Sequence, residues 1–123
     1  MAEEKKIVYV LSCDPKKDVE KVSEVLAQTL TALSFGYDCE LFFMGECVTL
    51  AKKGGAAGLK ASTFESIEVM LENYMEMEGK VFVCHPASDA RGLHEPDCLE
   101  GLKFVNASKL VESGVNAAAV FTF

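Results

Sequence analysis

The sequence predicts one α/β domain, in which a mostly parallel sheet of about five strands carries helices on both faces. Strand-like apolar runs alternate with amphipathic helical patterns along the chain, an order typical of βα units with right-handed crossovers. The length of 123 residues, with half of them apolar and a quarter charged, fits one hydrophobic core. We therefore expect residues 1–123 to form a single domain.

The first strand and helix follow directly from apolar spacing. KIVYVLS (residues 6–12) is a nearly continuous apolar run, as in a strand that is covered on both faces. Residues 19–33 repeat apolar side chains at helical spacing, after Asp18 as a cap and before Gly36 as a stop. YDCELFFMG (37–45) reads as the second strand.

The second half continues the alternation after a glycine-rich loop at residues 46–60. Ser62 and Glu65 have the spacing of a capping box before a second helix, and Gly79 follows that helix. The remaining expected elements are strands at 80–84, around 103–105 and at 117–123, with a helix from about Asn106 to Ser113 that stops at Gly114.

Charge and composition limit the cellular compartments and the classes of binding partner that we expect. The net charge is −7 and the twelve basic residues include a single arginine, which argues against a groove that follows a nucleic-acid backbone. The sequence shows no apolar segment of the length that a signal peptide or a membrane span needs. We expect a cytoplasmic protein whose five cysteines are thiols, and which binds neither nucleic acid nor membrane.

Three of the five cysteines are expected at one edge of the sheet. Cys13 follows the first strand, Cys47 follows the second and Cys84 ends the third. The carboxyl ends of parallel strands meet at one edge, where ligands and catalytic groups gather. Cys39 lies inside the second strand, so we expect it to be a small core side chain.

Cys84 has the most informative neighbours. Backbone N–H groups of a loop after the strand, together with Arg91 seven residues later, could stabilise a thiolate. His85 could assist proton transfer, or could be a polar surface group. The alternative for this segment is a packed, unreactive Cys84 with Arg91 in a surface ion pair.

The segment FVCHPASDARGL resembles the cysteine segment of the DsrE/DsrF-like sulfur-relay family. The opening KIVYVLSCDP, the stretch ELFFMGECVTLAKKGG and the closing NASKLVESGVNAAAVFTF also fall where that family has corresponding parts. The resemblance implies a flavodoxin-like (Rossmann-like) three-layer domain that assembles as a trimer or hexamer. Nearly the whole chain takes part in it.

The resemblance also implies a function and site residues. Cys84 matches the family's sulfur-accepting cysteine, and Arg91 and Gly92 match the Arg-Gly behind it. His85 and Asp89 depart from the family pattern, and an acidic residue at 89 opposes thiolate formation. The implied activity is that of a sulfurtransferase or sulfur carrier, which passes a persulfide between donor and acceptor proteins or small persulfides.

Other functions remain open at this point. Cys13 or Cys47 could pair with Cys84 in a reversible disulfide, or the chain could be an oligomeric binding module whose cysteines only pack. A zinc site could use Cys84, His85, His94 and Cys98, but their spacing fits no familiar zinc pattern. The glycine-rich loop lacks the phosphate-binding arrangements of glycines, so we expect no bound cofactor. From the spacing of the possible zinc ligands we also expect no metal.

Overall fold

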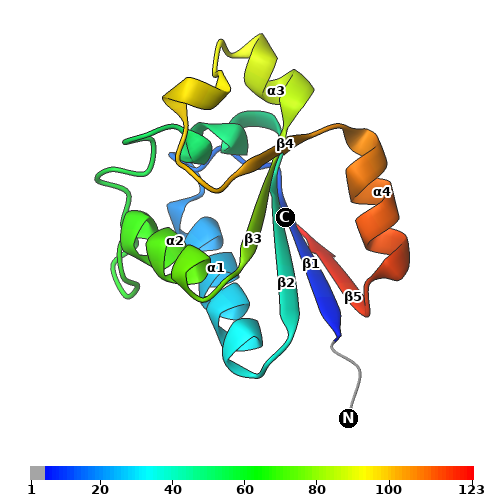
Figure 1. Ribbon diagram of the computed structural model, residues 1–123. Coiled ribbons are helices and arrows are strands. Elements are labelled where there is room, and N and C mark those ends of the chain that lie inside the picture. Colours follow the sequence, from blue (N-terminus) through cyan, green and yellow to red (C-terminus); the bar gives the residue numbers. More distant parts are fainter. Residues whose placement is uncertain (1–4) are drawn as a thin grey trace.

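A computed structural model describes residues 5–123 and shows a five-stranded parallel sheet between helical layers (Figure 1). The predicted fold class is confirmed. The strands are β1 (Lys6–Leu11), β2 (Asp38–Phe43), β3 (Lys80–Cys84), β4 (Lys103–Val105) and β5 (Ala119–Thr122). The helices are α1 (Val19–Ser34), α2 (Ile67–Glu76), α3 (His85–Ala90) and α4 (Ala107–Asn116), with 3-10 helices η1 (Gly45–Ala51) and η2 (Glu95–Asp97).

The strand order β4-β3-β2-β1-β5 decides which face each helix covers. The chain moves in one direction across the sheet from β1 to β4 and then returns past β1 to β5. Because crossovers between parallel strands are right-handed, α1 and α2 lie on one face and α4 lies on the other, as Figure 1 shows. The connection from β3 to β4 packs Leu93 and Leu99 on the α1/α2 face.

The larger core lies between the sheet and the layer formed by α1 and α2. Its strand residues alternate along β1 and β2, with Tyr9, Leu11, Leu41 and Phe43 facing this layer. Tyr74 of α2 is fully buried there, and its hydroxyl donates to the backbone carbonyl of Cys39 at 3.0 Å or of Lys80 at 2.7 Å. Cys39 is itself fully buried, as predicted.

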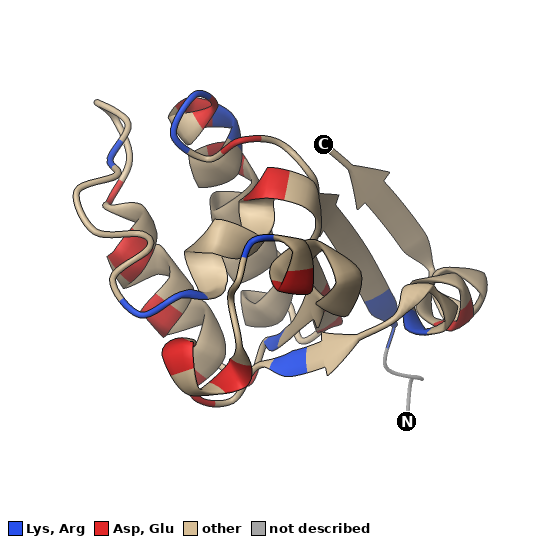
Figure 2. Ribbon diagram, turned by 90° about the horizontal axis from the view of Figure 1, so that it is seen from above, with Lys and Arg blue, Asp and Glu red and all other residues tan. Residues whose placement is uncertain are grey.

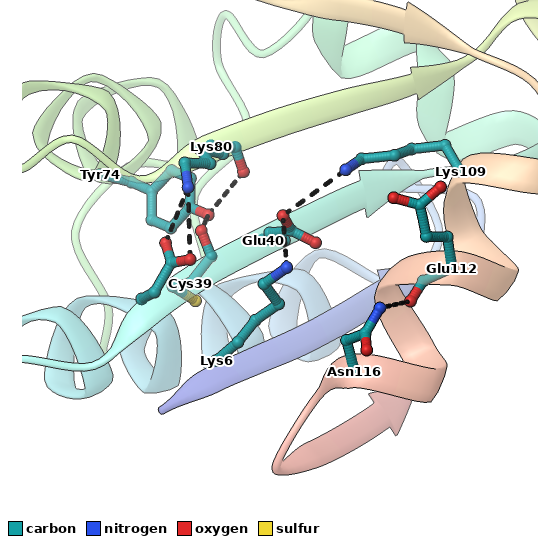
Figure 3. Close-up of polar contacts among 9 residues, drawn as sticks. Lys6, Cys39, Glu40, Tyr74, Lys80, Lys109, Glu112 and Asn116 are labelled. Atoms are coloured by element: carbon teal, nitrogen blue, oxygen red, sulfur yellow. Dashed lines mark hydrogen bonds and ion pairs between the residues drawn. The ribbon is translucent and has the colours of Figure 1, made fainter. Parts of the chain in front are cut away.

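A smaller core on the opposite face is covered by α4 alone. Its apolar part includes Phe42 and Phe82, whose rings stack with centroids 4.9 Å apart. Glu40 lies in the same layer, where Lys6 approaches its carboxylate to 3.5 Å and Lys109 to 4.0 Å (Figure 3). The two lysines compensate a carboxylate that burial would otherwise disfavour.

Two helix boundaries differ from the prediction. The capping box at Ser62 and Glu65 is wrong: α2 begins at Ile67, and its cap is Ser66, whose hydroxyl accepts the backbone N–H of Val69 at 3.3 Å. The end of α4 also differs: the helix was expected to stop at Gly114, but it continues to Asn116. Within residues 5–123, the helices are all too short or too polar to cross a bilayer.

Candidate functional site

Cys84 lies at the carboxyl end of β3, next to Val105 of β4. Its side chain is partly exposed and packs against the edge of the larger core. The three residues before it are buried, because β3 is an inner strand of the sheet. The strand therefore holds the thiol at a fixed position on the edge that solvent reaches.

The place of Cys84 in the topology is distinctive. The connection that leaves β3 packs on the α1/α2 face, whereas the connection that leaves β4 contains α4 and packs on the opposite face. Ligands of open α/β sheets bind in the crevice outside the carboxyl ends of the strands. Cys84 stands at this edge, where the connections of two neighbouring strands leave toward opposite faces.

A short helix, α3, follows Cys84 where the sequence indicated a loop. Pro86 lies in its first turn, a position that proline suits because the N–H it lacks has no partner inside the helix. The helix ends at Ala90, and Gly92, two residues later, has a positive φ of 68°. His85 is exposed as the first residue of α3, and Gly92 contributes the turn that ends it.

Arg91 contacts η1 through an ion pair. Its Nε donates to Oε1 of Glu46 at 2.9 Å, and its Nη1 donates to the carbonyl of Ala87 at 3.0 Å. This is the surface ion pair that the sequence left open as the alternative for Arg91. Glu46 could not be predicted as the partner, because the two residues are 45 positions apart. The contact fastens the end of α3 to the segment that follows β2.

Cys13 and Cys47 lie together at the other side of this edge. Cys13 follows β1 and is partly exposed, whereas Cys47 lies in η1 and is buried. Each thiol is the largest influence on the pKa of the other. The structure thus makes neighbours of two of the three predicted edge thiols, Cys13 and Cys47.

The residues of the zinc alternative do not converge. Cys98 is buried beside an isolated antiparallel bridge to Lys52, while His85 and His94 are exposed. In the part of the chain that the structure describes, no group of three or more His, Cys, Asp or Glu side chains is arranged to hold a metal ion.

A hollow of about 540 Å³ lies between η1, the glycine-rich loop and the end of α3. Its charged lining is mostly basic although the protein carries a net charge of −7. Figure 2 shows that both basic and acidic segments lie at this end of the molecule. Sequence reasoning missed this hollow, for which the adjacent lysines of KKGG were the available signal. The charged residues that line it are Lys16, Glu46, Lys52, Lys53 and Arg91.

Solved structures of other proteins share the fold of this chain over nearly its full length. The crystal structure of the YchN protein of E. coli matches with a TM-score of 0.73 and 20% identity, over 98% of this chain and all of that one. A conserved protein of unknown function from Bacteroides thetaiotaomicron matches with a TM-score of 0.71 and 13% identity, over 96% and 94% of the two chains. At these identities the likeness shows the fold.

Sequence comparison shows the family. An uncharacterized protein of Methanopyrus kandleri is 30% identical over 105 residues, covering 85% of this chain and 84% of that protein. An uncharacterized protein of Methanocaldococcus jannaschii is 32% identical over 104 residues, covering 85% and 88%. The model of the DsrE/DsrF-like family matches residues 5–123. The chain belongs to the DsrE/DsrF-like family.

Proposed function

We propose that this protein carries sulfur as a persulfide on Cys84 and passes it between thiols. One observation carries the proposal: Cys84 is a partly exposed thiol at the carboxyl end of an inner strand, the edge at which ligands of open α/β sheets bind. Family membership supports the same residue, because the segment around Cys84 resembles the cysteine segment of the sulfur-relay members.

The chemistry is an exchange between thiolates and persulfides. The Cys84 thiolate attacks the terminal sulfur of a donor R–S–SH, which forms Cys84–S–SH and releases R–S⁻. An acceptor thiolate R′–S⁻ then attacks the terminal sulfur on Cys84, which forms R′–S–SH and restores the Cys84 thiolate. Each step breaks one S–S bond and forms another, so the relay needs neither oxidant nor reductant.

Arg91 has a positioning role in this proposal. Its contacts to Glu46 and Ala87 fasten α3 to η1, and α3 begins directly after Cys84. Removing the guanidinium would loosen the segment next to the thiol. Arg91→Ala should therefore slow sulfur uptake more than Glu46→Gln, since the Glu46 amide can still accept a hydrogen bond from Arg91.

Sulfur uptake by defined variants tests the proposal. Reduced protein is incubated with a small-molecule persulfide, and its intact mass is compared for wild type, Cys84→Ser and Cys13→Ser. Cys13 is the matched control because it is also a partly exposed thiol at the same edge. We expect one added sulfur in wild type and Cys13→Ser and none in Cys84→Ser. Equal uptake by Cys84→Ser would refute the assignment.

We also propose that copies of the chain assemble into an oligomer. Four apolar side chains of α4 and β5 lie at the surface: Val111 is 65% exposed, Val115 79%, Val120 44% and Phe121 43%. Edge strand β5 pairs only with β1 within the described chain. Apolar side chains beside an unpaired strand edge favour burial against another subunit.

A further inference from the structure

A second thiol site lies apart from Cys84, at the ends of β1 and β2. Cys13 follows β1, and Cys47 lies in the 3-10 helix η1 after β2. Each thiol is the largest influence on the pKa of the other, and the ends of β1 and β2 that carry them are adjacent in the sheet, so the two side chains are neighbours. Two neighbouring cysteines can be joined by a disulfide when their Cα atoms come within about 7 Å.

The backbone around this pair is held on both sides. The N–H of Met44 donates to the carbonyl of Leu11 at 2.8 Å, which joins the ends of β1 and β2. Gly45 lies close to Ser12, the residue that follows β1. A Cβ at position 45 would be 3.1 Å from the carbonyl oxygen of Ser12. On the other side, the N–H of Ser12 donates to the carbonyl of Phe123 at 2.9 Å. The two thiols therefore meet within an ordered frame.

The two thiols differ in their access to solvent. Cys13 is partly exposed, whereas Cys47 is fully buried in the larger core. A dissolved oxidant can therefore reach the Cys13 thiol directly. Cys47 is accessible only to its neighbour Cys13. This asymmetry gives each thiol a separate role, one that attacks and one that resolves.

Ionisation has the same asymmetry. The hydrogen bond from Cys47 lowers the pKa of Cys13 to about 7, because a thiol that donates to a thiolate stabilises it. The same contact, together with burial, raises the pKa of Cys47 far above its ordinary value. At neutral pH the pair carries its thiolate on the exposed member, where nucleophilic attack is possible.

We propose that Cys13 and Cys47 form a reversible disulfide when the protein meets a hydroperoxide, with Cys13 as the attacking thiol and Cys47 as the resolving thiol. The Cys13 thiolate attacks the distal oxygen of R–O–OH, the O–O bond breaks, and Cys13–S–OH and R–O⁻ result, the latter taking up a proton. Cys47 then displaces hydroxide from Cys13–S–OH, which forms the S–S bond and water. The two cysteine sulfurs lose two electrons in total, and the peroxide gains them.

This site is distinct from the sulfur-carrying thiol. Strand β2 separates β1 from β3 in the sheet, so Cys13 and Cys84 follow strands that are not neighbours. The proposal therefore stands whether or not Cys84 carries sulfur. A disulfide at the end of β1 would give the fold an oxidised and a reduced form without consuming Cys84.

Peptide mapping after peroxide treatment tests the pair. Reduced full-length protein is treated with hydrogen peroxide, the remaining thiols are alkylated, and the protein is digested after glutamate without reductant. Glu20, Glu40 and Glu46 place Cys13, Cys39 and Cys47 on separate peptides. We expect a cross-linked Cys13–Cys47 peptide, with the loss of two hydrogen atoms, that disappears when the sample is reduced with dithiothreitol.

Two variants separate the roles of the thiols. In Cys47→Ala, which keeps a small apolar side chain in the core, Cys13 should stop at a sulfenic acid that dimedone traps. In Cys84→Ser the cross-link should form at the wild-type rate. The proposal is overturned if wild-type protein shows no Cys13–Cys47 cross-link while Cys13 is oxidised further, or if Cys13 stays reduced while Cys84 reacts.

Discussion

Cys13 and Cys84 are both partly exposed cysteines at the carboxyl edge, but their neighbours differ. Cys13 has a second thiol, Cys47, as a neighbour that lowers its pKa, whereas Cys84 ends an inner strand of the sheet. Thiolate character and access together govern thiol reactivity. The local environment of each cysteine therefore suggests a different chemistry for it, a disulfide at Cys13 and sulfur carriage at Cys84.

The alkylation rate of Cys13 should depend on pH with a midpoint near its lowered pKa of about 7. The charged groups that act on it are Asp18, which raises the pKa, and Lys21, which lowers it. The thiolate fraction, and with it the rate, rises as pH rises through this value. In Cys47→Ala the midpoint should move up toward the ordinary thiol value of about 8.5.

This is measured by alkylation with iodoacetamide from pH 5.5 to 9.5, read out on the Cys13 peptide. Lys17→Ala serves as a control, because it changes a basic side chain near Cys13 in the sequence without touching the Cys47 contact. A midpoint that stays the same after Cys47→Ala would show that the thiol contact does not stabilise the thiolate.

We expect the hydroxyl of Tyr74 to contribute to the free energy of unfolding through its hydrogen bonds in the larger core. Tyr74→Phe removes the hydroxyl and leaves the buried carbonyls of Cys39 and Lys80 without that donor, which should cost about 1–3 kcal/mol. Urea unfolding of the variant measures this loss. Tyr37→Phe is the matched control, since Tyr37 is 37% exposed, and an equal loss in both variants would contradict the account.

At the scale of the elements, apolar spacing predicted the long helices and the strands well. β3 and β4 were predicted with the bounds that the structure shows, and β1 and β2 within one or two residues. β1, β2 and β3 are inner strands with helices on both faces, so their apolar runs are nearly continuous. The 3-10 helix η1 and the helix α3 were missed, because seven and six residues are too few to show a helical repeat.

The start of α2 was predicted wrongly for a physical reason. Ser62 and Ser66 both precede Ile67, the first residue of α2, and Glu65 gave Ser62 the better capping pattern. In the structure the carbonyl of Leu59 accepts the N–H of Ile67 at 3.0 Å, which keeps residues 60–66 in a loop. This tertiary contact cannot be read from local sequence.

The observed cap makes a prediction at this scale. Ser66→Ala removes the acceptor for the N–H of Val69 and should lower the free energy of unfolding by about 1 kcal/mol. Ser62→Ala should change it little, because Ser62 lies in the preceding loop. Both values come from urea unfolding followed by circular dichroism, and a larger loss in Ser62→Ala would contradict the observed helix start.

At the scale of the whole molecule, the sequence predicted that Cys13, Cys47 and Cys84 reach one edge but not how they are grouped there. Grouping depends on strand order, and chain order alone does not fix which strands are neighbours. The order β4-β3-β2-β1-β5 puts Cys84 at the end of β3 and Cys13 after β1, with β2 between these two strands. The partner of Arg91 could not be predicted from the sequence either, because Glu46 belongs to a segment far from Arg91 along the chain.

The proposed assembly also belongs to this scale. Val111→Glu with Val115→Glu places charge on the exposed apolar face of α4 and should shift the protein to a smaller assembly. Sedimentation velocity compares the variant with wild type, and Glu112→Lys controls for a change of charge on the same helix. A wild-type protein that sediments as a monomer would contradict the proposed oligomer.

The most direct test of sulfur carriage is the distribution of sulfur over all five cysteines of wild-type protein. Reduced protein is mixed with a persulfide donor, quenched by alkylation after short intervals, and mapped at each cysteine. Our account predicts that the first sulfur appears on Cys84 and then leaves it when an acceptor thiol is added. Sulfur that appears first on Cys13, or a Cys84 that neither gains sulfur nor reacts with the alkylating reagent, would contradict the account.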